Sequence, residues 1–133
     1  RGSAGISATF SNSGVGTGTG FSLTAPLANV AVQIDSDGSN SQISSTGASV
    51  NLDTHAATGS SDIILHGRIT TTTNGGTLLV TADAQLSIGV NGDLITDGAV
   101  TLAAAGGIDT AGDITTTSDA IDFQNNVVMT AKN

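Results

Sequence analysis

The side chains best suited to binding a metal ion lie in one short acidic segment. Asp35, Asp37 and Asn40 are separated only by Ser and Gly, and Ca²⁺ prefers several oxygen ligands at close spacing. The segment departs from an EF-hand loop, because its Gly is fourth rather than sixth and the chain contains no Glu. It predicts a calcium site at Asp35, Asp37 and Asn40, with an ordinary turn as the alternative. No other cofactor is predicted.

Two histidines raise the question of acid and base catalysis. His55 follows Asp53 by two residues, and His66 precedes Arg68 by two; such neighbours can tune a histidine for proton transfer. The alternative is a surface histidine on a strand or corner. Arg68 is the one basic residue away from the termini, and Trp and Tyr, which stack on sugars, are absent. We therefore predict no catalytic residue and no enzymatic activity.

The charge balance excludes several classes of partner. The chain has 11 acidic residues, all Asp, and three basic residues, which gives a net charge of −8. Binding to nucleic acid depends on Lys and Arg displacing counterions, so nucleic acid is not an expected partner. No apolar run approaches the roughly 20 residues of a membrane-spanning helix, so no membrane insertion is expected. Cysteine is absent, which excludes disulfides and thiolate chemistry.

The elements that position these residues are predicted to be β-strands. Gly, Thr, Ser, Asn and Asp dominate the polar residues, and this composition favours turns and β-surfaces over helices. Apolar and polar residues alternate with a period of two in many short runs, as expected for strands with one buried face. The clearest runs are 21–25, 30–34, 50–52, 78–88, 100–104, 121–123 and 127–131.

One sequence phrase recurs along the chain. An aliphatic residue is followed by a run rich in Thr and Ser and then by a second apolar pair. The four anchors of this phrase are Ile43, Ile69, Leu94 and Ile114, spaced by 26, 25 and 20 residues. The last three follow a Gly-x pair: Gly67-Arg68, Gly92-Asp93 and Gly112-Asp113. A repeat of this length, made of short strands and polar corners, is typical of one coil of a β-solenoid.

We therefore predict an all-β fold, a parallel β-helix (β-solenoid) of about five to six irregular coils. Residues 1–40 are expected to form less regular strands that lead into the solenoid, and residues 41–133 its regular repeats, within a single continuous domain. Small side chains and the near absence of aromatics suit a narrow aliphatic interior. A β-sandwich is the main alternative, although it gives no reason for the phrase to recur.

The segment from Gly112 to Ala131, GDITTTSDAIDFQNNVVMTA, resembles repeats of filamentous-haemagglutinin-like bacterial surface proteins. The resemblance covers about residues 40–133 and is compositional. It implies a right-handed β-helix within a large secreted adhesin or fibre, and it supplies no catalytic residues. The chain begins at Arg1 without an initiator Met or an apolar signal segment, which predicts a processed or excised piece.

These observations predict a structural or adhesive β-solenoid segment of a secreted protein at the bacterial cell surface. No capping element is evident at its end, so end-to-end stacking into an extracellular filament is one expected form of assembly. The expected partners are neighbouring copies or parent-chain neighbours, together with host or bacterial surface glycans and proteins. The alternative is a carbohydrate-active β-helix enzyme or glycan-binding module. Threonine runs at 70–73 and 115–117 suggest a further, minor alternative, an outward Thr face that orders water or binds ice.

Overall fold

The structure is a computed structural model, and it describes residues 10–12, 19–24, 32–35, 41–54, 61–72 and 75–131. All regular secondary structure in these ranges is β-strand, and the strands form three sheets of five strands each. Sheet A contains β1 (Phe10–Asn12), β4 (Ser41–Thr46), β7 (Arg68–Thr72), β10 (Leu94–Thr96) and β13 (Ile114–Thr116). Sheet B contains β2 (Thr19–Thr24), β5 (Ser49–Asp53), β8 (Leu78–Ala82), β11 (Val100–Ala104) and β14 (Ile121–Phe123). Sheet C contains β3 (Val32–Ile34), β6 (Ile63–Leu65), β9 (Gln85–Ile88), β12 (Gly107–Thr110) and β15 (Val127–Met129).

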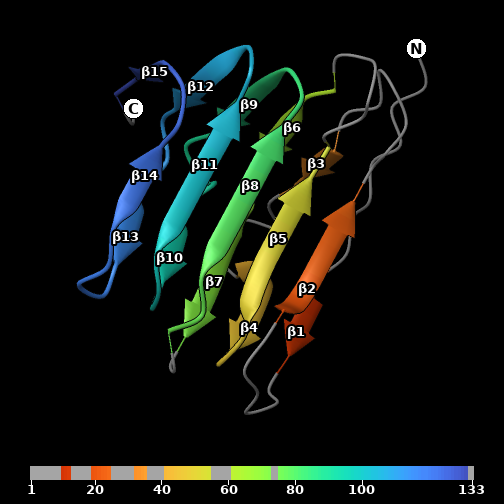
Figure 1. The fold of residues 1–133 in the computed structure, drawn as a ribbon, viewed down its shortest axis with the longest axis vertical. Coiled ribbons are helices and arrows are strands. Elements are labelled where there is room, and N and C mark those ends of the chain that lie inside the picture. The colour runs from red at the N-terminus through yellow and green to blue at the C-terminus, as the bar shows by residue number, and fades with distance from the viewer. Residues whose placement is uncertain are drawn as a thin grey trace.

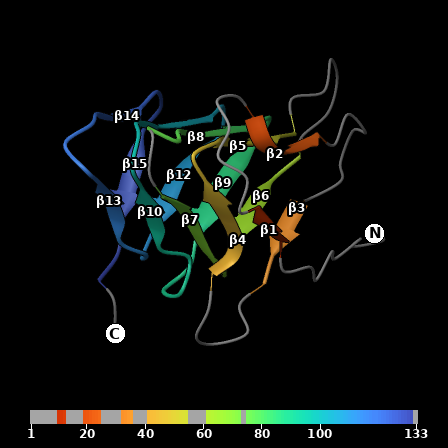
Figure 2. The same ribbon diagram turned by 90° about the horizontal axis from the view of Figure 1, so that it is seen from below.

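The chain visits the three sheets in the same order on every coil. Each strand from β1 to β12 pairs in parallel with the strand three places later in the chain, as in the series β2, β5, β8, β11 and β14 at the front of Figure 1. The three sheets enclose one interior, since residues of all three belong to a single buried cluster. The view from below shows sheet B along the top, above the other two sheets (Figure 2). The predicted parallel β-solenoid is thus confirmed. It makes about four turns, slightly fewer than the predicted five to six coils.

The strand register confirms the repeat that the sequence suggested. Ile43 lies opposite Ile69, Ile69 opposite Leu94, and Leu94 opposite Ile114. The four anchors therefore form one ladder along sheet A, despite their unequal spacing in the sequence. Every strand pair of the described residues is parallel, which rules out the antiparallel β-sandwich for this part of the chain.

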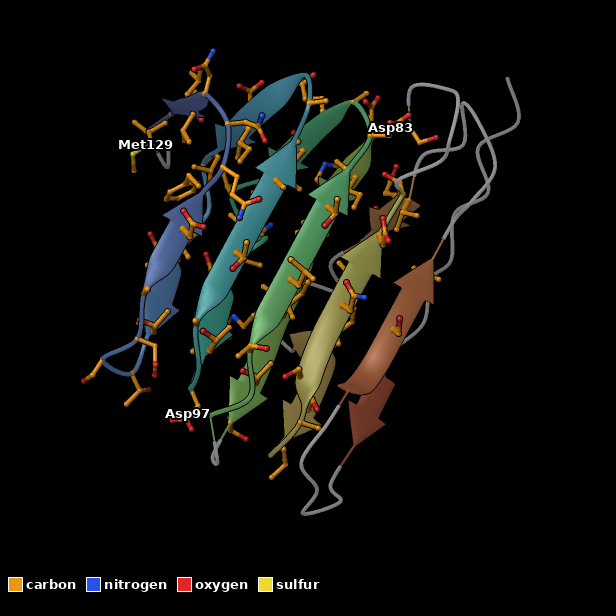
Figure 3. The ribbon with its side chains drawn as sticks, in the orientation of Figure 1. Asp83, Asp97 and Met129 are labelled. Atoms are coloured by element: carbon orange, nitrogen blue, oxygen red, sulfur yellow. The ribbon has the colours of Figure 1, made fainter. Side chains whose placement is uncertain are left out.

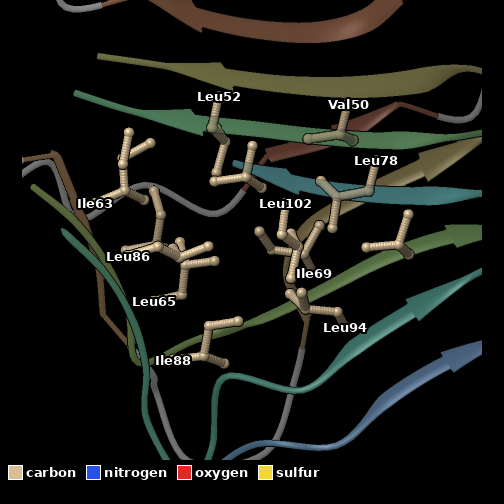
Figure 4. Close-up of a cluster of buried hydrophobic side chains, with 14 of the residues drawn as sticks. Val50, Leu52, Ile63, Leu65, Ile69, Leu78, Leu86, Ile88, Leu94 and Leu102 are labelled. Atoms are coloured by element: carbon tan, nitrogen blue, oxygen red, sulfur yellow. The ribbon is translucent and has the colours of Figure 1, made fainter. Parts of the chain in front are cut away.

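The core consists of aliphatic ladders that run along the axis of the solenoid. Figure 4 shows Ile63, Leu65, Leu86 and Ile88 of sheet C meeting the side chains of sheets A and B in the interior. Most members of this cluster are fully buried. Because residues in register on neighbouring parallel strands lie about 4.8 Å apart, each side chain packs against its equivalents above and below. Axial stacking therefore supplies the core that a single coil is too thin to form.

A column of hydroxyl groups also faces the interior, at the corner between sheets A and B. Its members occupy equivalent positions on successive strands: Ser45, Thr71, Thr96 and Thr116. The three threonine hydroxyls donate hydrogen bonds of 2.5 to 2.6 Å to the corner carbonyls of Gly76, Gly98 and Asp119. These bonds let polar corner backbone enter the interior without leaving its carbonyl groups unpaired. The buried Ser45 hydroxyl has no partner among the described residues.

Thr96→Val should destabilise the solenoid by about 1 to 2 kcal/mol, because the variant keeps the shape of the side chain but removes a buried donor from the Gly98 carbonyl. The matched control is Thr101→Val on the outward face of β11, which should change the free energy of unfolding by less than about 0.5 kcal/mol. Urea denaturation of both variants measures the difference. Equal stabilities would show that the interior hydroxyl bond contributes nothing.

Candidate functional site

The most distinctive surface of the molecule is the end of the solenoid formed by β13, β14 and β15. Each of these strands is the last of its sheet, so within the described residues no further strand pairs with its outer edge. Their side chains continue the interior ladders: Ile121 lies opposite Val100, and Phe123 opposite Leu102. Val100 and Leu102 are fully buried, whereas Ile121 and Phe123 are 39% and 36% exposed. We call this end, defined by β13, β14 and β15, the open end.

Apolar side chains of all three last strands meet at a hollow in the open end. The hollow has a volume of about 430 Å³, and its lining includes Ile114, Ile121, Phe123 and Met129. Met129 is 80% exposed, and Figure 3 shows it at the extremity of the stack, beside β15. Its register partner on β12 is Thr110, which is buried. The open end thus combines an apolar surface with three parallel strand edges.

The predicted calcium residues are placed only in part. Asp35 directly follows β3 and is exposed, and its Oδ1 accepts a hydrogen bond of 2.6 Å from Nε2 of Gln33. Asp37 and Asn40 lie outside the described residues. In the described ranges, no group of three or more His, Asp or Glu side chains that could hold a metal ion is found. The calcium site stays a prediction.

Asp35 instead meets one of the two histidines. His66 Nδ1 lies 3.5 Å from Asp35 Oδ1, with both side chains about half exposed. The pairing follows from the register Ile34 opposite Leu65, which places the next residue of each strand side by side at the corner after sheet C. Asp35 and His66 line a shallow hollow of about 460 Å³ together with Gly89, Val90 and Asn91. His55 lies outside the described residues, so the structure does not place it relative to Asp53.

A second charged contact lies close to His66 at the same corner. Arg68 Nη2 is 3.3 Å from Asp93 Oδ2, and the other oxygen of Asp93 accepts a hydrogen bond of 3.0 Å from the backbone N–H of Asp113. Asp93 is buried. This carboxylate therefore ties three successive coils together. Sequence reasoning missed the pair, although the x residues of the Gly-x anchors carry opposite charges at the same repeat position.

The outward threonines of sheet A do not form a continuous row. Thr70 lies opposite Ile95, and Ile95 lies opposite Thr115. The residues that follow along the outward face are Thr72, Asp97 and Thr117. An ordered Thr-x-Thr array on successive coils is therefore interrupted at β10. The structural requirement of the water-ordering hypothesis is not met on this face.

The described residues contain no helix of sufficient length and apolar character to cross a membrane. Comparison with protein-family models, curated protein sequences and solved structures gives no match for this chain.

Proposed function

We propose that this chain is a structural and adhesive segment of a secreted bacterial surface protein, related to the filamentous-haemagglutinin-like proteins that its repeat resembles. The open end is the observation that carries the proposal. Its interior ladders stop at exposed apolar residues, Ile121, Phe123 and Met129, beside three unpaired strand edges in the described part of the chain. Such an end accepts a further coil with parallel strands, from a neighbouring segment or another copy.

The proposed role is mechanical, and the chain acts outside the cell. Every coil contributes one strand to each of three parallel sheets, and the interior ladders join neighbouring coils along the axis. A stack of this kind forms a stiff rod, and its outward side chains and corners are free to vary without disturbing the ladders. Recognition of surface glycans or proteins is assigned to these outward faces. In this proposal the chain is not an enzyme and binds no nucleic acid.

Electron microscopy of the purified chain over a range of concentrations, with and without calcium, tests this proposal. We expect particles of constant cross-section that lengthen with concentration, with an axial repeat near 4.8 Å. Lengthening that requires calcium would support the predicted ion site at Asp35. Short particles of one length under all conditions would contradict self-association, and ligand searches would then turn to glycans and host proteins for a stalk segment.

The contact between Asp35 and His66 supports a second candidate, a carbohydrate-active module. The pair lies in a hollow that is open to solvent, and a carboxylate beside a histidine can transfer protons. The test is polysaccharide cleavage by the wild-type chain and by His66→Ala, with Gln85→Ala as an outward control. Under the structural proposal neither protein releases oligosaccharides. Cleavage by the wild type that is lost only in His66→Ala would favour the carbohydrate-active module.

A further inference from the structure

The open end has the features of an interface that the molecule already contains. Neighbouring coils of the chain meet through parallel strand pairing on three sheets and through aliphatic ladders between them. At the open end the same three strand edges and the same ladder positions are present, but no coil of the described chain covers them. Its best occupant therefore presents three parallel strands in the same order and direction, with aliphatic residues at the ladder positions.

The first coil of the chain, formed by β1, β2 and β3, has its three strands in this order and direction, and its ladder positions are apolar, with Phe10 and Phe21 at two of them. It lies at the opposite end of the stack, where each of its strands is the first of its sheet. Leu23 packs against the core cluster, and Val32 and Ile34 are members of that cluster. Their partners on the second coil are Leu52, Ile63 and Leu65. The first coil therefore shares the register of the stack, and its opposite strand edges pair with no strand of the described residues.

Resting on the proposed function, we infer that the open end binds the first coil of a second copy of this chain, head to tail, in the register that the chain uses internally. β2 of the second copy then pairs with β14, and β3 with β15. The interior pairs are Leu23 with Phe123, Val32 with Val127, and Ile34 with Met129. Because the interface is heterologous and the coils continue along one axis, the product is an open filament.

Charge favours this arrangement over the contact of two open ends. On the outward faces, the inferred register places Ser22 opposite Asp122 and Gln33 opposite Val128. Both residues of the first coil are uncharged, so the interface adds no carboxylate opposite Asp122. Two open ends facing each other would instead bring together two copies of Asp113 and Asp122 on a protein of net charge −8, and would require antiparallel strands. Like charges at such contacts are destabilising.

Cysteine cross-linking tests the register, because the chain has no cysteine of its own. Four variants are made separately: Ser22→Cys, Gln33→Cys, Asp122→Cys and Val128→Cys. Residues paired on neighbouring parallel strands have Cα atoms about 4.8 Å apart, within the range that a disulfide spans. Variants are mixed in pairs under conditions where microscopy shows lengthening, and oxidised glutathione is added as the oxidant.

The matched mixtures 22 with 122 and 33 with 128 should give at least about tenfold more covalent dimer than the crossed mixtures 22 with 128 and 33 with 122, because only matched thiols share a high effective concentration. Each variant oxidised alone should give no more dimer than the crossed mixtures. The two matched pairs lie on different sheets, so the register can still be tested with one pair if a substitution in the other disturbs the fold. Dimer from Asp122→Cys alone, or equal yields from all mixtures, would overturn the head-to-tail register. If the particles still lengthen, end-to-end stacking survives that result in another register. If they do not lengthen under any condition, the head-to-tail inference fails, and the proposed function is left as a stalk segment without self-association.

Discussion

Leu86→Ala should lower the free energy of unfolding by about 2 to 5 kcal/mol, the range for removing a large aliphatic side chain from a packed core. Leu86 lies on β9 in the middle coil and is fully buried. Its ladder partners are Ile63 on one side and Ile108 on the other. Because the adjacent coils hold Ile63 and Ile108 in place, the cavity left by the truncated Leu86 side chain cannot close by local collapse. Urea denaturation followed by circular dichroism measures the loss.

The same type of truncation should cost much less at the open end. Ile121→Ala and Phe123→Ala remove ladder side chains that remain 39% and 36% exposed, so we expect losses of about 1 to 2 kcal/mol. Leu79→Ala, on the outward face of β8, is the control and should cost less than about 1 kcal/mol. The measurements belong at concentrations where particles do not lengthen, since stacking would bury the same residues. Equal costs at Leu86 and Phe123 would contradict the placement of Phe123 at an uncovered end.

The strands and their register could be predicted because the interior of a solenoid imposes a strict local pattern. An inward aliphatic residue recurs at each equivalent position, so the anchors Ile43, Ile69 and Leu94 are visible in the sequence and lie opposite one another in the structure. The unequal spacing is absorbed at the corners. Corners lengthen without changing the ladders, which explains why an irregular repeat still produces a regular core.

The corner within the longest alternating run could not be predicted. Residues 78–88 look like one strand, but they form β8 and β9, with a bend at Asp83 and Ala84. The alternation continues across the bend, because Ala82 and Leu86 both face inward. A period of two therefore carries no signal at this corner. The bend depends on long-range hydrogen bonds, in which Ala84 N–H donates to the Ser61 carbonyl and Asp83 N–H to the Thr54 hydroxyl.

The interior hydroxyl column also could not be predicted from the alternation of apolar and polar residues. Polar residues in an alternating strand are expected to face solvent, yet Thr71 and Thr96 are buried. Their hydroxyls donate to corner carbonyls, which come within hydrogen-bond distance only when the chain turns toward the next strand. The Thr-rich part of the repeated phrase therefore has two roles, since alternate threonines face the interior and the solvent.

The charged contacts do not follow from residues that are close together in the chain, such as Asp35 and Asp37 or His66 and Arg68. In a solenoid the relevant neighbour is one coil away, so His66 contacts Asp35, and Arg68 contacts Asp93 on the following coil. The spacing between Arg68 and Asp93 equals the 25-residue spacing of the anchors Ile69 and Leu94. The repeat itself contained the signal for this pair.

The recurring glycine of the Gly-x anchors explains the second large effect that we expect. Gly92 lies at the corner before β10, where a Cβ atom would lie directly against the Leu65 carbonyl oxygen and 3.1 Å from Cγ2 of Ile88. At the equivalent Gly112, a Cβ atom would meet the Gly89 carbonyl oxygen at 2.9 Å. At both anchor glycines the backbone of the preceding coil thus leaves too little room for a Cβ atom, and backbone atoms cannot move aside as a flexible side chain can.

Gly92→Ala should therefore destabilise the solenoid by about 3 kcal/mol, at the upper end of the range for overpacking. Gly89→Ala, three residues earlier, is the matched control. Its Cβ atom would meet Cδ2 of the exposed His66 side chain at 3.0 Å, and rotation of that side chain relieves the contact, so the cost should stay below about 1 kcal/mol. Thermal and urea denaturation of the two variants and of the wild type measure these losses of stability. If Gly92→Ala were as stable as Gly89→Ala, backbone contact between coils would not be what requires glycine before the anchor, and the recurrence of this residue would need another cause.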